Sequence, residues 1–195
     1  MSATPIQDEQ LGRTLLAIAR NAIGTHPGFK FDATPAHEAL QRAGATFVTL
    51  FTAGELHGCI GSLEARRPLA IDVHENALGA AFWDARFDAL RAEEFSDTSI
   101  EVSLLSPSEE LDASDERALL RQLQPGVDGV TIAFRGRRAT FLPQVWRALP
   151  EPEEFLAALK QKAELPRHFW SPKLNVTRYR VTQWREHEPW MKERL

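Results

Sequence analysis

The chain has 195 residues, of which 43% are hydrophobic and 26% charged, the composition of an ordinary soluble globular protein. Lysine and arginine total 23 against 27 aspartates and glutamates, which gives a formal net charge of -4. Such a chain lacks the global positive field that holds nucleic acid or an anionic membrane by charge alone. Its single cysteine, Cys59, excludes an internal disulfide and a zinc site built from several cysteines.

The sequence predicts neither a signal peptide nor a membrane-spanning segment. Met1–Gln10 carries acidic residues and has no apolar core. No apolar run approaches the ~20 residues that a helix needs to cross a bilayer. We therefore expect a cytoplasmic protein that does not bind a membrane. One domain is expected over residues 8–186, with tails at 1–7 and 187–195.

The first 35 residues predict a helix followed by a loop. Between Leu11 and Ile23 the apolar residues fall on one helical stripe. Gly24 is expected to end this helix in the left-handed conformation that glycine adopts easily. Prolines and a glycine then predict a loop over residues 25–35.

Two strands and a second helix are predicted next. β-Branched and aromatic residues favour a strand over 46–51, which Ala53–Gly54 connects by a turn to a second strand over 56–63. Pro68 suits the first turn of a helix. Several apolar positions of that helix are alanine, so its narrow face permits close packing on a sheet.

The second half of the chain mixes strands with short helices. Alternating apolar and polar residues predict a half-buried strand over 100–104. No regular βαβ order occurs, which favours an α+β fold with a mostly antiparallel sheet flanked by helices. The other predicted elements are a helix over 114–123, a hairpin of strands 130–134 and 138–142, a helix over 152–162 and a strand over 177–182.

The segment Gly54–Ser62 is the strongest candidate for chemistry. Its glycines, including Gly58 and Gly61, permit backbone conformations that other residues avoid and let a ligand approach closely. Residues two apart in an extended strand share a side, so His57 and Cys59 can meet there. Two interpretations stay open. One is a nucleophilic thiol or an anion-binding nest of N–H groups, and the other is a β-bulge with a small buried thiol.

A second candidate lies in and after the helix that follows Pro68. Asn76 belongs to the helix, and Asp84 and Arg86 lie together at its end. Arginine can hold a carboxylate or phosphate in a planar fork, so these residues can bind a polar substrate. The alternative is an Asp–Arg ion pair that caps the helix and fixes the following loop.

Metal and nucleic-acid binding find less support in the sequence. The candidate metal ligands are His57, Cys59, His74 and Glu101, but neither His-Glu-x-x-His nor paired Cys-x-x-Cys spacing occurs, so no metal site is predicted. Arginine clusters near aromatic residues could form a surface that binds nucleic acid. The acidic total argues against this, and nucleic-acid binding is the weakest of the functions considered.

A series of motifs runs in a fixed order from about Leu11 to Trp184. Its densest part is Leu56-His-Gly-Cys-Ile-Gly-Ser62, followed by Ala80-Ala-Phe-Trp-Asp-Ala-Arg-Phe87. The series resembles the AMMECR-one domain family, whose bacterial and archaeal members are called AmmeMemoRadiSam system protein A. The further motifs are Asn76-Ala77, Ile100-Glu-Val-Ser-Leu-Leu-Ser106, Pro125-Gly126, Asp128-Gly129-Val130, Phe141-Leu-Pro-Gln-Val-Trp146, Phe155-Leu156, Lys162-Ala163 and Trp170.

The resemblance implies an α+β fold of two subdomains, the larger with an antiparallel sheet flanked by helices. The family has a Leu-Arg-Gly-Cys-Ile-Gly run at the position of Leu56–Gly61, and His57 stands where that run has arginine. Histidine is positively charged only near or below about pH 6.5. If the arginine binds an anionic ligand, His57 would do so only when protonated, whereas in a structural role histidine can replace it.

The resemblance also implies a system that includes a Memo-like protein and a radical SAM protein, which are therefore the expected partners. We expect Cys59 to act as a nucleophile or thiol anchor, with His57 as its base or a ligand contact. A non-catalytic interaction module that binds one of these partners is the rival hypothesis. The sequence identifies no cofactor. The residues expected to bind a small polar substrate are Gly58, Gly61, Asn76, Asp84 and Arg86.

Overall fold

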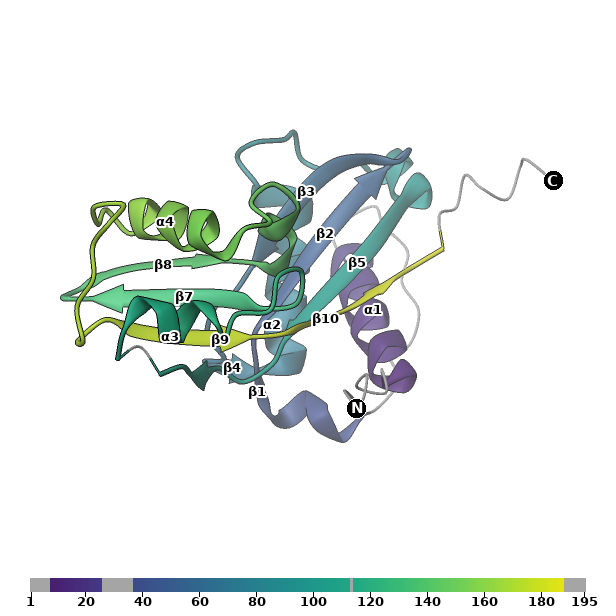
Figure 1. Cartoon of the computed structure of the whole chain (residues 1–195). Helices are drawn as coiled ribbons and strands as arrows, with labels where there is room; N and C mark the ends of the chain where they lie inside the picture. Colours follow the sequence, from purple (N-terminus) through teal and green to yellow (C-terminus); the bar gives the residue numbers. More distant parts are fainter. Residues whose placement is uncertain (1–7, 26–36, 113, 188–195) are drawn as a thin grey trace. The chain divides into compact units, whose positions relative to one another are not determined.

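The computed structural model describes residues 8–25, 37–112 and 114–187 (Figure 1). The chain divides into two units, each with its own hydrophobic core. Unit 1 contains the described residues of 1–105 and 182–195, and unit 2 contains those of 106–181. The loop predicted over 25–35 and the tails predicted at 1–7 and 187–195 lie, apart from Thr25 and His187, outside the described residues. Each unit has a four-stranded sheet and helices, so the predicted α+β class is confirmed.

The sheet of unit 1 has the strand order β10-β5-β2-β3. The central strand β2 (Thr46–Thr52) pairs antiparallel with β3 (Glu55–Gly61) on one side and with β5 (Thr98–Leu105) on the other. Strand β10 (Val181–Arg185) completes the sheet next to β5. The predicted Ala53–Gly54 turn joins β2 to β3 through two residues with positive φ, 51° and 90°.

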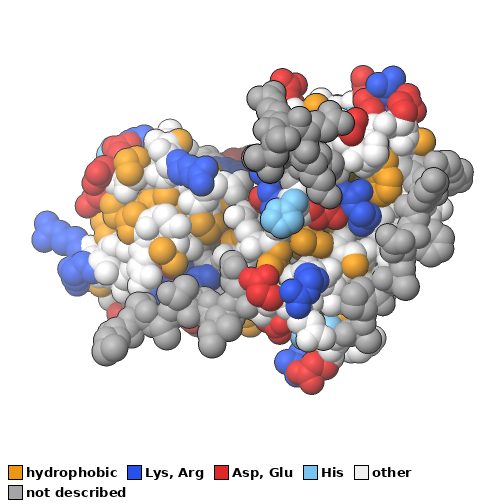
Figure 2. All heavy atoms as spheres, turned by 90° about the vertical axis from the view of Figure 1, so that its right-hand side faces the viewer, with side chains coloured by type: hydrophobic (Ala, Val, Ile, Leu, Met, Phe, Trp, Pro, Cys, Tyr) orange, Lys and Arg blue, Asp and Glu red, His pale blue; other side chains and the backbone are white. Residues whose placement is uncertain are grey.

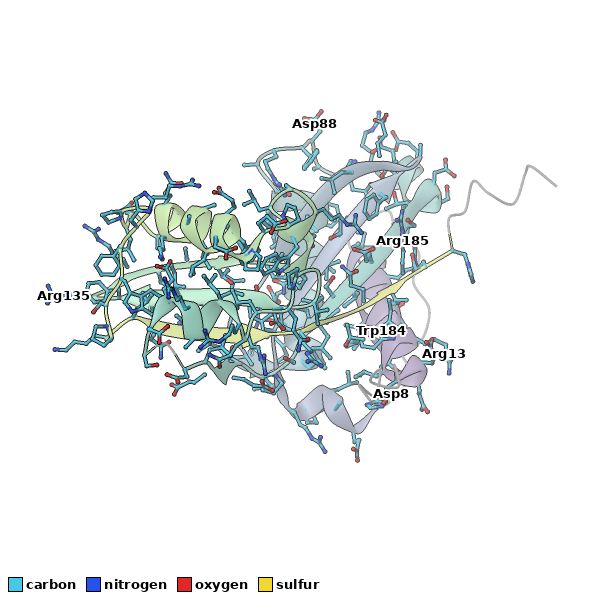
Figure 3. The ribbon with its side chains drawn as sticks, in the orientation of Figure 1. Asp8, Arg13, Asp88, Arg135, Trp184 and Arg185 are labelled. Atoms are coloured by element: carbon cyan, nitrogen blue, oxygen red, sulfur yellow. The ribbon has the colours of Figure 1, made fainter. Side chains whose placement is uncertain are left out.

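Helices α1 (Glu9–Gly24) and α2 (Leu69–Leu78) cover one face of this sheet (Figure 1). Trp184 of β10 packs on α1 (Figure 3), where a Cβ on Gly12 would lie 2.2 Å from the indole. The prediction that Gly24 ends α1 in a left-handed conformation is wrong, because Gly24 is the last helical residue and the helix is capped by Thr25 at φ -79°. The apolar strand residues beneath these helices are Val48, Leu50, Ile100 and Val102.

Shorter elements of unit 1 surround the sheet. The π-helix η2 (Gly79–Trp83) extends directly from α2 and packs against β3. Pro68 is the N-cap of α2 and not its first helical residue. The other short elements are η1 (Glu38–Gln41), β1 (Ala43–Gly44), β4 (Arg67–Pro68) and η3 (Ala92–Asp97), of which β1 and β4 form a two-stranded sheet.

The sheet of unit 2 has the order β6-β9-β7-β8 with antiparallel pairing throughout. The predicted hairpin turns at Arg135, which Figure 3 shows at the tip between β7 and β8. In the core, the rings of Trp146 and Phe155 stack at 3.6 Å between centroids. The elements are β6 (Glu109–Glu110), α3 (Glu116–Leu120), β7 (Gly129–Phe134), β8 (Arg137–Phe141), η4 (Pro143–Arg147), α4 (Pro152–Lys162) and β9 (Asn175–Tyr179).

The single strand predicted over 177–182 is wrong, because two strands occupy this region. Strand β9 ends at Tyr179 in the sheet of unit 2, and β10 begins at Val181 in the sheet of unit 1. The segments before and after Arg180 both carry residues that favour strands. Composition alone therefore does not show that one strand ends and another begins there.

Candidate functional site

The thiol of Cys59 lies half-buried on the edge strand β3 of unit 1. Its partner across the sheet is Thr49 of β2. The Thr49 hydroxyl donates a hydrogen bond to Cys59 Sγ at 3.2 Å. The hydroxyl therefore holds the sulfur, the atom through which a cysteine acts as a nucleophile, in a fixed direction. The sequence motif did not include Thr49, because only the strand register shows that the two residues face each other.

Asp84 and Arg86 hold the peptide group of Cys59 on the outer side of β3. The N–H of Cys59 donates to Asp84 Oδ2 at 2.9 Å, and its carbonyl accepts from Arg86 Nη2 at 3.0 Å. Arg86 also forms a fork with the carboxylate, with Nε–Oδ1 at 2.9 Å and Nη2–Oδ2 at 2.7 Å. The pair thus supplies at Cys59 the hydrogen bonds that a neighbouring strand would supply.

The Arg86 fork also determines the charge state of this pair. Hydrogen bonds from the guanidinium and from the N–H of Cys59 hold the pKa of the Asp84 carboxyl well below its usual range. The carboxylate in turn raises the pKa of Arg86. Both groups are therefore charged at neutral pH. Arg86 Nη1 has no hydrogen-bond partner among the described residues, and the side chain is 59% exposed, so this edge of the fork faces solvent.

Gly58 allows the π-helix to bring Asp84 to β3. A Cβ on Gly58 would lie 2.0 Å from the carbonyl oxygen of Ala80, closer than any side chain permits. At Gly61 a Cβ would lie 2.3 Å from the ring of Phe47. The groups that lie close to these two glycines therefore belong to the protein itself.

His57 lies at an irregularity of β3. The strand register shifts between Leu50 and Phe51, which pair with Gly58 and Leu56, so His57 is the extra residue of a β-bulge. Its ring stacks against Phe87, with 6.5 Å between centroids, and its buried Nε2 has no hydrogen-bond partner among the described residues. The structure brings Asp84 and Arg86 to Cys59, and it places the His57 ring against Phe87.

Asn76 belongs to a separate polar network around Asp72. The buried Asp72 carboxylate accepts hydrogen bonds from the Asn76 amide at 2.9 Å and from the Thr46 N–H at 2.8 Å. Ser62 Oγ, at 2.7 Å, and Arg67 Nε, at 2.9 Å, also donate to it. The network ties α2 to the adjoining ends of β2 and β3. Sequence reasoning missed Asp72, although an acidic residue in the first turn of a predicted helix was visible.

Side chains that could hold a metal ion are dispersed over the described part of the chain. Among those residues, no three His, Cys, Asp or Glu side chains are grouped so that they could hold a metal ion. The helices that the structure describes include none long and apolar enough to cross a membrane. On the face shown in Figure 2, described acidic and basic side chains are interspersed, so those residues form no extended basic patch there.

The chain is similar to known proteins over most of its length. The AMMECR1 family profile matches residues 16–184. A protein of Methanothermobacter thermautotrophicus is 36% identical over 190 residues, which cover 93% of this chain and 96% of that protein. Protein MK0488 of Methanopyrus kandleri is 32% identical over 189 residues, covering 91% and 89% of the two chains.

A solved structure shares the fold. The crystal structure of the uncharacterized protein PH0010 from Pyrococcus horikoshii matches with a TM-score of 0.77 at 29% identity. The match covers 94% of this chain and 95% of that one. The similarity therefore extends over both units and includes the segment that carries Cys59.

Proposed function

Because the chain belongs to the AMMECR1 family, as its motifs predicted, we propose that it handles a small polar substrate at Cys59. In this proposal the thiol is a nucleophile or an anchor for the substrate. The observation that carries it is the hydrogen bond from Thr49 to Cys59 Sγ at 3.2 Å. A half-buried thiol with a donor on its sulfur differs from an inert core cysteine, which packs as a small apolar group.

The surrounding residues have distinct roles in this proposal. Asp84 fixes the peptide group of Cys59 and thereby the direction of the thiol. Arg86 shares that role and offers its exposed Nη1 edge to a polar group of the substrate. Gly58 and Gly61 keep β3 close to its neighbours. His57 is assigned to ligand contact near Phe87, since the stacking seen there does not direct it at the sulfur.

Asn76 has an indirect role in the same proposal. Its amide is engaged with Asp72 and Thr46, so we assign it to holding α2 against the sheet and no longer to the substrate. The protein would work in the cytoplasm as a component of a system with a Memo-like protein and a radical SAM protein. Binding of either purified protein at micromolar concentration tests that assignment, and absence of both complexes would contradict it.

Alkylation of the thiol tests the central proposal. Cys59 is the only cysteine in the sequence, so iodoacetamide labelling followed by mass spectrometry reports on this residue alone. We expect labelling of the native protein at pH 7. Thr49→Val should lower the rate of alkylation about three- to tenfold, because one hydrogen bond to sulfur is lost. Thr49→Ser keeps the hydroxyl and should keep the wild-type rate. Labelling that requires denaturation would refute the proposal.

A non-catalytic interaction module is the second candidate, and one observation favours it. Trp83 is 65% exposed and directly precedes Asp84. Exposed tryptophans are frequent hot spots of protein interfaces. If this function is correct, Trp83→Ala should abolish binding to the Memo-like or radical SAM partner, whereas Cys59→Ser should leave binding intact.

A further inference from the structure

The sheet of unit 1 has a second face, opposite the one that α1 and α2 cover. Side chains alternate between the two faces along each strand. Because Val48, Leu50, Ile100 and Val102 point to the helices, their neighbours point the other way. We call this second surface the open face, because α1 and α2 do not cover it. Its residues include Phe47, Thr49 and Phe51 of β2, Cys59 of β3, and Glu101 and Ser103 of β5.

Cys59, Thr49 and Glu101 form one row across the open face. Thr49 is the direct partner of Cys59 on β3 and of Glu101 on β5. Neighbouring strands are about 4.8 Å apart, so the thiol and the carboxyl lie roughly 10 Å from each other with Thr49 between them. The row therefore has a nucleophilic group at one end and an acidic group at the other.

Glu101 is a half-buried carboxyl that forms no ion pair among the described residues. Burial raises the pKa of this carboxyl, and the charge of Arg185 partly offsets the effect. Its contact with Gln183 Nε2 is long, 3.5 Å, and Gln183 also donates to Ser103 Oγ at 3.0 Å. Burying a carboxylate is costly, and Arg185 compensates this cost only in part, so a bound cation would stabilise the ionised form of Glu101.

Aromatic side chains flank the row on both sides. Phe47 and Phe51 lie two residues before and after Thr49 on β2, and so they share the open face with it. The guanidinium of Arg185 already lies over the Phe51 ring at 4.0 Å, which shows that this face accommodates a cation against an aromatic ring. A ligand lying along the row would contact apolar walls at both sides.

We propose that the substrate handled at Cys59 is a small amine that lies across β2, with its ammonium group at Glu101 and its reacting end at the thiol. The inference rests on the function proposed for Cys59 and adds the substrate class and a specificity residue. Glu101 binds the amine, Thr49 lies beneath the connecting chain, and the phenyl rings limit its width. The separation of about 10 Å favours amines whose reacting group is several bonds from the nitrogen.

Methanethiosulfonate reagents test this assignment on the full-length protein. The thiolate attacks the thiosulfonate sulfur, a disulfide forms and methanesulfinate leaves, so the rate reports on access to Cys59. The two probes are 6-aminohexyl and hexyl methanethiosulfonate, which differ in the terminal ammonium group. Glu101→Gln removes the acidic group, Glu101→Asp retains it, and Glu75→Gln removes an equal charge from α2 on the covered face.

We expect the wild-type protein to react faster with the aminohexyl than with the hexyl reagent by about fivefold, the size expected for one charge pair near a protein surface. Glu101→Gln should abolish this preference, while Glu101→Asp and Glu75→Gln retain it. Equal rates with both reagents in the wild type would overturn the amine assignment and leave the function of Cys59 standing. Failure of both reagents to modify native Cys59 would overturn the function itself.

Discussion

The carboxylate of Asp84 accepts the backbone N–H of Cys59 at 2.9 Å, although 25 residues separate them in the sequence. The bond satisfies a polar group on the outer side of an edge strand, where Arg86 binds the carbonyl of the same residue. Edge strands are open to pairing with other chains unless their polar groups are covered. The pair therefore protects β3 at Cys59 and fixes the residue whose thiol we assign to chemistry.

Asp84→Asn should destabilise the protein by about 1–3 kcal/mol at pH 7, because it removes the fork with Arg86 and weakens the acceptor for the Cys59 N–H. The pKa of Asp84 is lowered in the native state. Its contribution to the free energy of unfolding is therefore present above the pKa of the unfolded state, about 4, and is lost as the pH falls through the pKa of the native state. Urea unfolding at several pH values measures this. A difference between variant and wild type that stays constant down to pH 2 would contradict it.

Gly58→Ala should destabilise the protein by about 3 kcal/mol or more, because the new methyl group meets the carbonyl of Ala80 at 2.0 Å and backbone must move. Gly79→Ala is a matched control. Its methyl group would meet the Ile60 side chain at 3.0 Å, and a side chain can adjust by a few tenths of an ångström. Thermal unfolding should therefore show a much larger loss for Gly58→Ala, and equal losses would argue against the close approach.

Much of the fold could be predicted from local patterns. The stripe between Leu11 and Ile23 indicates α1, and the alternation over 100–104 indicates β5. The turns at Ala53–Gly54 and Arg135–Gly136 could be predicted because each contains a glycine, which adopts the positive φ of such turns easily. These signals lie within short segments, so they do not require knowledge of which strands pair.

The candidate site was predictable only in part. The motif points to Cys59, Asp84 and Arg86, which the structure brings together. The partner that donates to the sulfur, Thr49, depends on register across β2 and β3. A one-residue shift in the register of β2 would turn the Thr49 side chain to the opposite face of the sheet. The bulge at His57 is likewise a property of pairing, which a single strand sequence does not specify.

Asp128→Asn should reduce the pH dependence of stability between about pH 4 and 7. Burial raises the pKa of Asp128, even though the Gln124 N–H at 2.8 Å and the charge of Arg178 lower it. The native state therefore binds a proton more readily than the unfolded state, and this residue makes stability fall as the pH rises through the native pKa. Asparagine cannot ionise and still accepts from Gln124. Chemical unfolding at pH 4 and 7 should show the variant gaining stability relative to wild type at the higher pH.

The ion pair between Lys160 and Glu116 in unit 2 provides a test of how a fully buried lysine is stabilised. Lys160 of α4 is 0% exposed, and its Nζ binds Glu116 of α3 and lies 5.5 Å from the centroid of the Trp170 ring. Lys160→Met replaces the charge with an apolar chain of similar length, so it should change the free energy of unfolding by less than about 1 kcal/mol. Glu116→Gln leaves the ammonium group buried without its counter-ion.

Glu116→Gln should therefore lower the free energy of unfolding by about 1–3 kcal/mol. The loss is smaller than for breaking a fully buried pair, because Glu116 is 40% exposed. Urea denaturation of the two single variants and the double variant separates the contributions. Once Lys160 is methionine, no buried charge remains to be neutralised, so adding Glu116→Gln should cost less than about 0.5 kcal/mol. If Glu116→Gln costs the same in both backgrounds, the carboxylate acts through something other than Lys160, and the ion pair contributes little to the stability of unit 2.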